Sequence, residues 1–267
     1  MSVSAGVASA QESGSSGKYH PFLSDNFHLG LGVYRPSKKR KIGADPNDGG
    51  SPGKSLDASD SQSTGMLNFR WRYTKNWFFE GTYWNTDSES GETLTEDFEY
   101  GDVKFLAGTS VRSEVDTSII RLFWGRSFYR RPSTDWGVGL GLHVLAIDAI
   151  LEGNILVPPG DPPIPDHHEK ASVSVPLPNL GIWYMYSWSP NWVFTTRLNW
   201  LNITFEEFSG SMYDLSVGVN YQMSDHFGIG LAANAFKLNL QVDDADWRGS
   251  FVDEQIGPHL YVTWNWQ

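Results

Sequence analysis

The chain has 267 residues, no cysteine and a formal net charge of −11 at pH 7. The lack of cysteine excludes a disulfide scaffold and a thiolate metal site. The acidic balance argues against a nucleic-acid partner, because nucleic-acid phosphates require a basic surface. Aromatic residues make up 14% of the chain, yet the mean hydropathy is only −0.36, and no run approaches the roughly 18 apolar residues of a membrane helix.

The N-terminus carries a small-x-small pattern, Ala8-Ser9-Ala10, followed by Gln11-Glu12. This pattern is typical of a signal-peptidase site, although the residues before it lack a basic region and are short for a signal core. We interpret 1–10 as the remainder of a signal peptide whose start lies further upstream, with a chance match as the alternative. Residues 11–25 then form a segment ahead of the first strand, and 26–267 form one β domain.

Apolar and polar residues alternate repeatedly along the rest of the chain, which indicates strands with one apolar face. Phe27, Leu29, Leu31 and Val33 begin this pattern. The alternating segments are, in chain order, 27–33, 67–73, 77–83, 120–125, 136–144, 182–186, 194–200, 213–221, 227–234 and 260–266. They predict about ten strands, with eight or twelve as alternatives. Segment 97–112 fits either an extension of a neighbouring strand or a surface hairpin.

The connections between these strands alternate between short and long. The short ones are 74–76, 129–135, 189–191 and 223–226, and the long ones are 35–64, 86–116 and 150–172, with smaller members at 204–210 and 243–248. A soluble sandwich has no reason to keep this alternation, whereas a transmembrane barrel has short turns at one end and long loops at the other. The sequence therefore predicts an all-β fold, a closed antiparallel transmembrane barrel.

Aromatic residues bracket the short turns and end the chain. The set consists of Tyr73, Trp77, Trp136, Trp188, Trp192, Tyr221, Phe227, Trp264 and Trp266. Amphipathic rings favour the level of lipid headgroups, so we expect these residues to form a girdle at the membrane interface. The last strand, 260–267, alternates to its end, with Gln267 following the final aromatic residue.

On these patterns, on the glycine-rich strands at 137–141 and 228–230, and on the aromatic last strand, the chain resembles the small outer-membrane β-barrels of Gram-negative bacteria, a superfamily that includes OmpA-like and OmpW-like barrels. The resemblance covers about 26–267. It implies location in the bacterial outer membrane, short turns and both termini in the periplasm, and insertion by the barrel-assembly machinery. Members act as structural proteins, adhesins, channels or enzymes, so the resemblance implies no single function.

A set of polar residues falls on the strand faces that would point into the barrel. We expect Arg70, Arg72, Glu80, Arg121, Arg197, Asp214 and His259, together with Asn234, to face the lumen. Charges in a narrow enclosed space must pair or stay hydrated. A barrel of about ten strands has little open interior, so we favour a structural network that fills the lumen. A narrow pore, in which arginines favour anions, is the alternative.

Two of the long connections carry strong charge. Lys38, Lys39, Arg40 and Lys41, next to Arg35, form a basic cluster, which we interpret either as a solvated mobile loop or as a contact for lipopolysaccharide phosphates. The second connection is acidic. It contains Asp87, Glu89, Glu92, Glu96, Asp97, Glu99 and Asp102. Weak cation binding there is a minor hypothesis, and its spacing differs from that of an EF-hand.

An enzyme would require a base or nucleophile near the outer rim. His143 and Asp148 lie toward the outer end of a predicted strand, and His167 and His168 lie between Asp166 and Glu169 in the following loop. No catalytic signature surrounds them, and the catalytic pairs of the ten-stranded omptin proteases have no match here. We expect a monomeric, non-enzymatic barrel without cofactor or metal. It would have a structural or surface-interaction role among lipid and lipopolysaccharide, with a narrow solute channel and an enzyme for lipopolysaccharide or peptides as successive alternatives.

Overall fold

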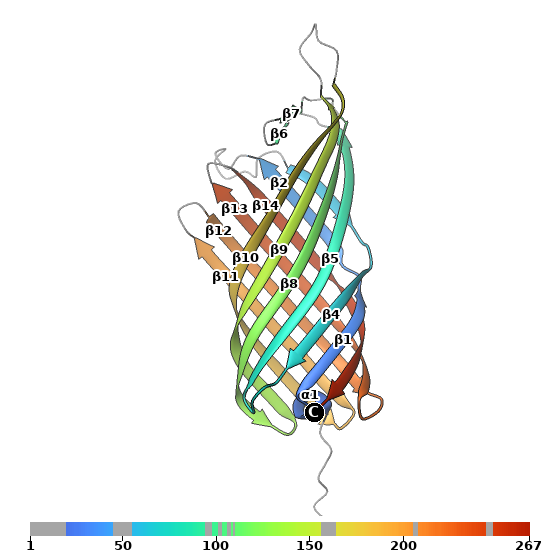
Figure 1. Ribbon diagram of the computed structural model, residues 1–267, viewed down its shortest axis with the longest axis vertical. Helices are drawn as coiled ribbons and strands as arrows, with labels where there is room; N and C mark the ends of the chain where they lie inside the picture. Colours follow the sequence, from blue (N-terminus) through green and yellow to red (C-terminus); the bar gives the residue numbers. More distant parts are fainter. Residues whose placement is uncertain are drawn as a thin grey trace, which may run out of the picture.

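The computed structural model describes residues 20–44, 55–93, 98–100, 103–105, 108, 110–155, 164–204, 208–243 and 248–267. It is a tall antiparallel β-barrel with both described ends of the chain at the same rim (Figure 1). Among the described residues, ten strands follow one another around the ring in the order β1-β4-β5-β8-β9-β10-β11-β12-β13-β14, and β14 pairs with β1 to close it. The prediction of a closed barrel of about ten strands is confirmed.

The bounds of the elements are as follows. The ring contains β1 (Phe27–Tyr34), β4 (Thr64–Trp71), β5 (Trp77–Thr93), β8 (Ser110–Arg131), β9 (Thr134–Ile155), β10 (Ile164–Ser189), β11 (Trp192–Thr204), β12 (Phe208–Gln222), β13 (Phe227–Asp243) and β14 (Arg248–Trp266). Outside it are α1 (Pro21–Ser24), β2 (Ser37–Ala44), β3 (Ser55–Asp60), β6 (Phe98–Tyr100) and β7 (Val103–Phe105). Within the described part of the chain, no helix has the length and apolar character that crossing a membrane requires.

The strands β2 and β3 extend the wall and do not form a loop above it. Tyr34 pairs with Thr64, and Lys38 pairs with Asp60, so the β1–β4 register continues unchanged into β2–β3. The Arg35 N–H donates to the Pro258 carbonyl at 3.0 Å, which bridges the short interval between β1 and β2. The expectation of a loop over 35–64 is therefore wrong for 37–44 and 55–60, and residues 45–54 lie outside the described part.

Other predicted loops are also shorter than expected, because the strands run beyond their apolar segments. β5 continues to Thr93, β8 begins at Ser110, and β9 and β10 reach Ile155 and Ile164. Strands β8, β9 and β10 rise highest in Figure 1. Their 22 to 26 residues far exceed the roughly ten that cross a bilayer. Segment 97–112 contains a small hairpin, β6–β7, and the first residues of β8.

Side chains alternate between the interior and the outer surface along each wall strand. On β1, for example, Leu29, Leu31 and Val33 are exposed, whereas His28 and Tyr34 are buried. The exposed large apolar side chains are spread over all ten ring strands. A surface of this kind would be unfavourable in water and suits the hydrocarbon of a bilayer.

The lower rim in Figure 1 holds the short turns and α1. The helix starts with Pro21, and the imidazole of His20 caps it by accepting from the Phe22 N–H at 3.2 Å. His20 and Leu23 are buried, and Leu23 packs against the lower interior of the barrel. The guanidinium of Arg130 donates to the Leu23 carbonyl at 2.7 Å. Residues 20–25, ahead of the first strand, therefore pack against the lower rim. Residues 1–19 lie outside the described part.

Candidate functional site in the barrel interior

The interior side chains of β5 show how the lumen is layered. From the lower rim upward they are Phe78, Glu80, Thr82, Trp84 and Thr86. The first belongs to a lower apolar cluster and Trp84 to an upper one, with polar residues between and above them. β8 repeats this order with Phe123, Arg121, Ile119 and Thr117, whereas β12 and β14 carry polar residues such as Asn220 and Asn265 toward the lower rim.

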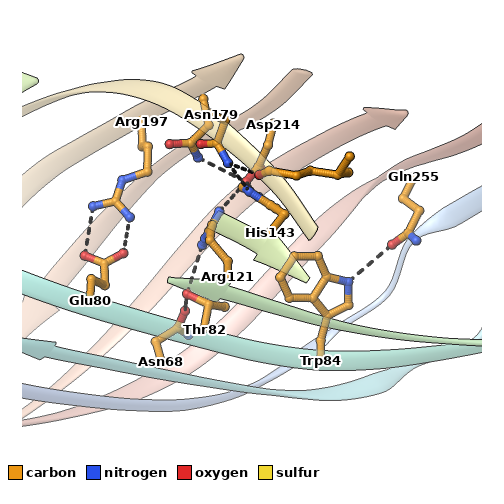
Figure 2. Close-up of polar contacts among 12 residues, drawn as sticks. Asn68, Glu80, Thr82, Trp84, Arg121, His143, Asn179, Arg197, Asp214 and Gln255 are labelled. Carbon is orange, nitrogen blue, oxygen red and sulfur yellow. Dashed lines mark hydrogen bonds and ion pairs between the residues drawn. The ribbon is translucent and has the colours of Figure 1, made fainter. Parts of the chain in front are cut away.

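Asp214 on β12 is the centre of the middle polar layer (Figure 2). Its Oδ2 accepts from the Arg121 guanidinium at 2.6 Å and from Asn199 Nδ2 at 3.2 Å, and it lies 3.0 Å from His143 Nε2. Arg121 also donates to Thr82 Oγ1 at 3.0 Å. The Asp214 carboxylate on β12 therefore contacts side chains from β8, β9 and β11, and each of these contacts offsets part of the cost of burying its charge.

Glu80 on β5 organises the second half of the same layer. It accepts from both terminal nitrogens of Arg197, one of them at 2.9 Å, in the two-point arrangement drawn in Figure 2. Arg70 Nε also donates to Glu80 at 3.0 Å. The Arg197 guanidinium lies 4.4 Å from the ring centre of Phe123 just below, so a cation–π contact connects this layer to the lower apolar cluster.

Further ion pairs lie beyond the two apolar clusters. At the lower rim, Arg72 and Asp135 are 2.6 Å apart, and Arg72 also donates to Ser127 Oγ at 3.1 Å. Near the upper end, Arg40 and Asp253 are 3.4 Å apart, with Arg40 also bonded to Thr86. These charged side chains are all nearly inaccessible to solvent.

One apolar cluster lies above the middle polar layer, and a second lies below the part of it next to β5, β8, β10 and β11. The upper cluster includes Tyr34, Met66, Trp84, Ile119, Leu145, Ile147, Leu177, Met212, Phe236, Leu238, Leu240 and Phe251. The lower cluster includes Leu23, Phe78, Phe123, Trp183, Met185 and Val193, with Phe22 of α1 packed against it. Such clusters carry few groups that could replace the hydration shell of a permeating ion.

A cavity of about 120 Å³ extends from the middle layer down to Phe22 and His28 near the lower rim. Arg70, Glu80, Arg121, Arg197 and His259 line it. Three of these side chains are guanidinium groups, and this polar space exceeds the volume that one water molecule needs.

The structure places every residue that the sequence predicted for the lumen on the inner side of the wall. Arg70, Arg72, Glu80, Arg121, Arg197, Asp214 and His259 all point inward, and Asn234 lies on an inner, half-buried position of β13. The predicted interface aromatics lie on the outer surface near the lower rim, where Trp188 and Trp192 stack at 5.9 Å and Trp192 contacts Tyr221 at 4.9 Å.

The side chains of the basic cluster point to opposite sides of the barrel wall. Lys38 and Arg40 are each 1% exposed and point into the upper lumen, whereas Lys39 and Lys41 point outward. The interpretation of all four as a solvated loop or a lipopolysaccharide contact is therefore wrong for Lys38 and Arg40. In the acidic connection, Asp87 and Glu89 lie on β5, and the side chains of Glu92, Glu96, Asp97, Glu99 and Asp102 lie outside the described part.

The hypothetical catalytic pair is likewise separated. His143 is fully buried and contacts Asp214, whereas Asp148 faces outward and binds the Ser172 hydroxyl. His167 and His168 belong to β10, although their side chains lie outside the described part. Neither His143 nor Asp148 therefore lies at an accessible rim beside the other.

Sequence reasoning missed several members of the interior. Asn179 contacts the His143 ring at 2.8 Å, and Trp84 donates to Gln255 at 3.4 Å. The signal that could have identified Lys38 and Arg40 was phase, because they continue the inward positions of Tyr34 and Pro36. The charged run conceals that alternation from a search for apolar residues.

The fold has known counterparts among solved structures. The outer membrane protease OmpT of Escherichia coli is 10% identical, with a TM-score of 0.60 over 91% of this chain and 97% of its own. The fold is that of an outer-membrane β-barrel. The apolar outer surface and the aromatic residues near the lower rim fit a location in the outer membrane. At 10% identity, the likeness to OmpT concerns the fold alone.

Other barrels match over most of their length but less closely. The toluene transporter TodX of Pseudomonas putida is 9% identical, with a TM-score of 0.38 over 92% of both chains. The attachment invasion locus protein Ail of Yersinia pestis is 11% identical, with a TM-score of 0.29 over 89% of this chain and 98% of its own. No family model matches the sequence, and no curated protein is similar to it.

Proposed function

We propose that the chain is a closed, non-enzymatic barrel with a structural or surface-interaction role in the outer membrane. The observation that carries this proposal is the ion-paired Asp214–Glu80 layer, which crosses the lumen beneath the upper apolar cluster. A filled lumen supports a rigid wall and leaves the outer surface as the place for contact with other molecules. The barrel acts as a monomer among lipid and lipopolysaccharide, after insertion by the barrel-assembly machinery.

The upper part of the outer surface supports a role in contact. Above the apolar belt, β2 presents Lys39 and Lys41, and the neighbouring β14 presents Glu254, which pairs with Lys237. Outward lysines at this height suit the phosphates of lipopolysaccharide. We therefore keep Lys39 and Lys41 as the proposed lipopolysaccharide contacts.

A narrow channel for small solutes is the second candidate, and the central cavity favours it. Arg70, Arg121 and Arg197 line it and pair with two carboxylates, Glu80 in the lining and Asp214 beside it. This arrangement would favour anions in a conducting state. An ion would also have to pass the upper apolar cluster.

Single-channel conductance of the refolded protein in a planar bilayer separates the two candidates. We expect no current from a folded, heat-modifiable barrel, nor from the Arg121→Ala, Arg197→Ala variant. Opening a passage through the upper cluster with Trp84→Ala and Phe236→Ala should produce conductance if that cluster is the barrier. A reproducible anion-leaning current in the wild type that changes in the arginine variant would establish the channel instead.

An enzyme for lipopolysaccharide or peptides is the third candidate, for which OmpT supplies a precedent only at the level of fold. The burial of His143 and Asp214 argues against it, because a substrate cannot reach them in this arrangement. Incubation with peptide mixtures and with lipopolysaccharide should leave both unchanged. Cleavage that His143→Ala abolishes in a folded barrel would overturn the non-enzymatic proposal.

A further inference from the structure

The outer wall carries an apolar groove of about 440 Å³ across β8, β9, β10 and β11. Its lining includes Trp124, Val138, Leu140, Leu180, Ile182 and Trp200. These side chains are on the membrane-facing surface, so a lipid acyl chain is the chemistry that they fit.

Two glycines of β9 and β10 lie beneath this groove. A Cβ on Gly139 would lie 2.6 Å from the Phe123 ring, and one on Gly181 would lie 2.5 Å from the same ring. Both glycines also line the floor of the groove. The Phe123 ring therefore packs directly against the backbone of two adjacent strands beneath the groove, and a larger residue at either position would displace it.

Among the described residues that line the groove, Arg126 on β8 is the only cation. Its guanidinium lies 5.5 Å from the ring centres of both Trp77 and Phe128, and the side chain is exposed. Within the described part of the chain, Arg126 has no acidic partner and its contacts are with these rings. Its N–H groups are thus held at the surface, where they can donate to an anion.

The surroundings of Arg126 at the lower rim are basic, although the whole chain is acidic. Arg131 and Lys75 are exposed nearby and line a second surface hollow with Arg130. Asp135, the acidic residue on the adjoining part of β9, is buried and paired with Arg72. An anionic headgroup would therefore meet several cations and no exposed carboxylate of β8 or β9 at this rim.

The height of Arg126 identifies the leaflet. It pairs across the strands with Trp77 and Val138, next to the aromatic girdle and the short turns. The short turns of such barrels face the periplasm, whereas lipopolysaccharide occupies the opposite leaflet. We propose that the groove and Arg126 bind one anionic glycerophospholipid of the periplasmic leaflet, with its phosphate on Arg126 and an acyl chain along the apolar lining.

Native mass spectrometry of the detergent-solubilised full chain, mixed with phosphatidylglycerol or phosphatidylethanolamine, tests this site. Arg126→Gln removes the phosphate donor, and Leu180→Trp fills the groove while leaving Arg126 in place. Matched controls are Arg112→Gln at the outer end of the same strand and Leu231→Trp, a lipid-facing residue of β13 outside the groove. All of these positions are exposed, so the barrel should fold in each variant.

We expect one phosphatidylglycerol to be retained by the wild type in preference to phosphatidylethanolamine. Retention should fall roughly tenfold in Arg126→Gln, the loss expected for one charge-assisted hydrogen bond. It should fall in Leu180→Trp as well, with both controls unchanged. Equal retention of the two lipids, equal retention in Arg126→Gln, or preferential capture of lipopolysaccharide would each overturn the proposal.

Discussion

Arg121 Nη1 lies 2.6 Å from Asp214 Oδ2, and the two side chains come from β8 and β12 on different sides of the barrel. His143 and Asn199 approach the same oxygen. The pair therefore cross-links the wall through the lumen. A buried ion pair contributes little net stability by itself, but the removal of one partner leaves the other charge uncompensated.

The first prediction concerns this carboxylate. Asp214→Asn should lower the free energy of unfolding by about 3–5 kcal/mol, because Arg121 would remain buried without its partner. Equilibrium unfolding in urea from lipid vesicles, followed by tryptophan fluorescence, measures the change. Asp148→Asn is the matched control, since it removes an outward-facing carboxylate and should change stability far less. Equal effects of the two substitutions would contradict a cross-linking role for Asp214.

The second prediction concerns close approach of the backbone. A Cβ on Gly137 would lie 2.1 Å from the Arg126 carbonyl oxygen, and a backbone atom cannot rotate away. Gly137→Ala should therefore destabilise the barrel by about 1–3 kcal/mol, measured as the urea midpoint. Gly65→Ala meets no atom within 4 Å and should be neutral or slightly stabilising. A neutral Gly137→Ala would mean that β8 and β9 separate more easily than the packing indicates.

The sequence predicted the ring because the membrane requires an apolar outer face on every strand. Leu29, Leu31 and Val33 on β1 and their counterparts on the other strands keep a strict period of two. Above the bilayer this requirement ends, and the extension of β5 is polar on both sides, with Thr86 inside and Asn85 and Asp87 outside. Its length therefore could not be inferred from apolar alternation.

The interior was predictable in composition but not in partnership. Position along a strand shows that Glu80 and Arg197 face inward, yet their pairing depends on strand tilt and stagger around the closed ring. The inward position of Arg40 was hidden because its neighbours Lys39 and Lys41 are also basic. The site of α1 was likewise not predictable, since no periodicity marks four residues.

The third prediction concerns three aspartates that lie side by side on the outer surface. Asp116 on β8 pairs in register with Asp87 on β5 and with Asp148 on β9. Like charges directly opposite one another destabilise a sheet, so Asp116→Asn should raise stability by about 0.2–1 kcal/mol. The gain should shrink at high salt, where the repulsion is screened. Glu254→Gln, which removes a carboxylate paired with Lys237, should give no such gain in the same unfolding measurement.

The fourth prediction concerns pH and the docking of α1. Burial lowers the pKa of His20 from 6.5 to about 4. Protonation would place a charge in a buried position, where Nε2 has no hydrogen-bond partner among the described residues. Arg130 also binds the adjacent Leu23 carbonyl, and Arg70 lies over the Phe22 ring, so cations already surround this segment.

His20 binds a proton more tightly when α1 is undocked than when it is docked, and this difference sets the direction of the pH effect on docking. Undocked His20 keeps its ordinary pKa and gains a proton as the pH falls below about 6.5, whereas docked His20 stays neutral until about pH 4. Docking is therefore complete above this window and weakens within it by up to about tenfold per pH unit.

Hydrogen exchange measures this change. The Leu23 and Asp25 amides, which bond to the His20 and Pro21 carbonyls, should lose protection as the pH falls through the window, once the rates are corrected for intrinsic exchange. His20→Asn retains a helix-capping oxygen but does not titrate, so its protection should be independent of pH. The same pH response in that variant would assign the effect to a different group.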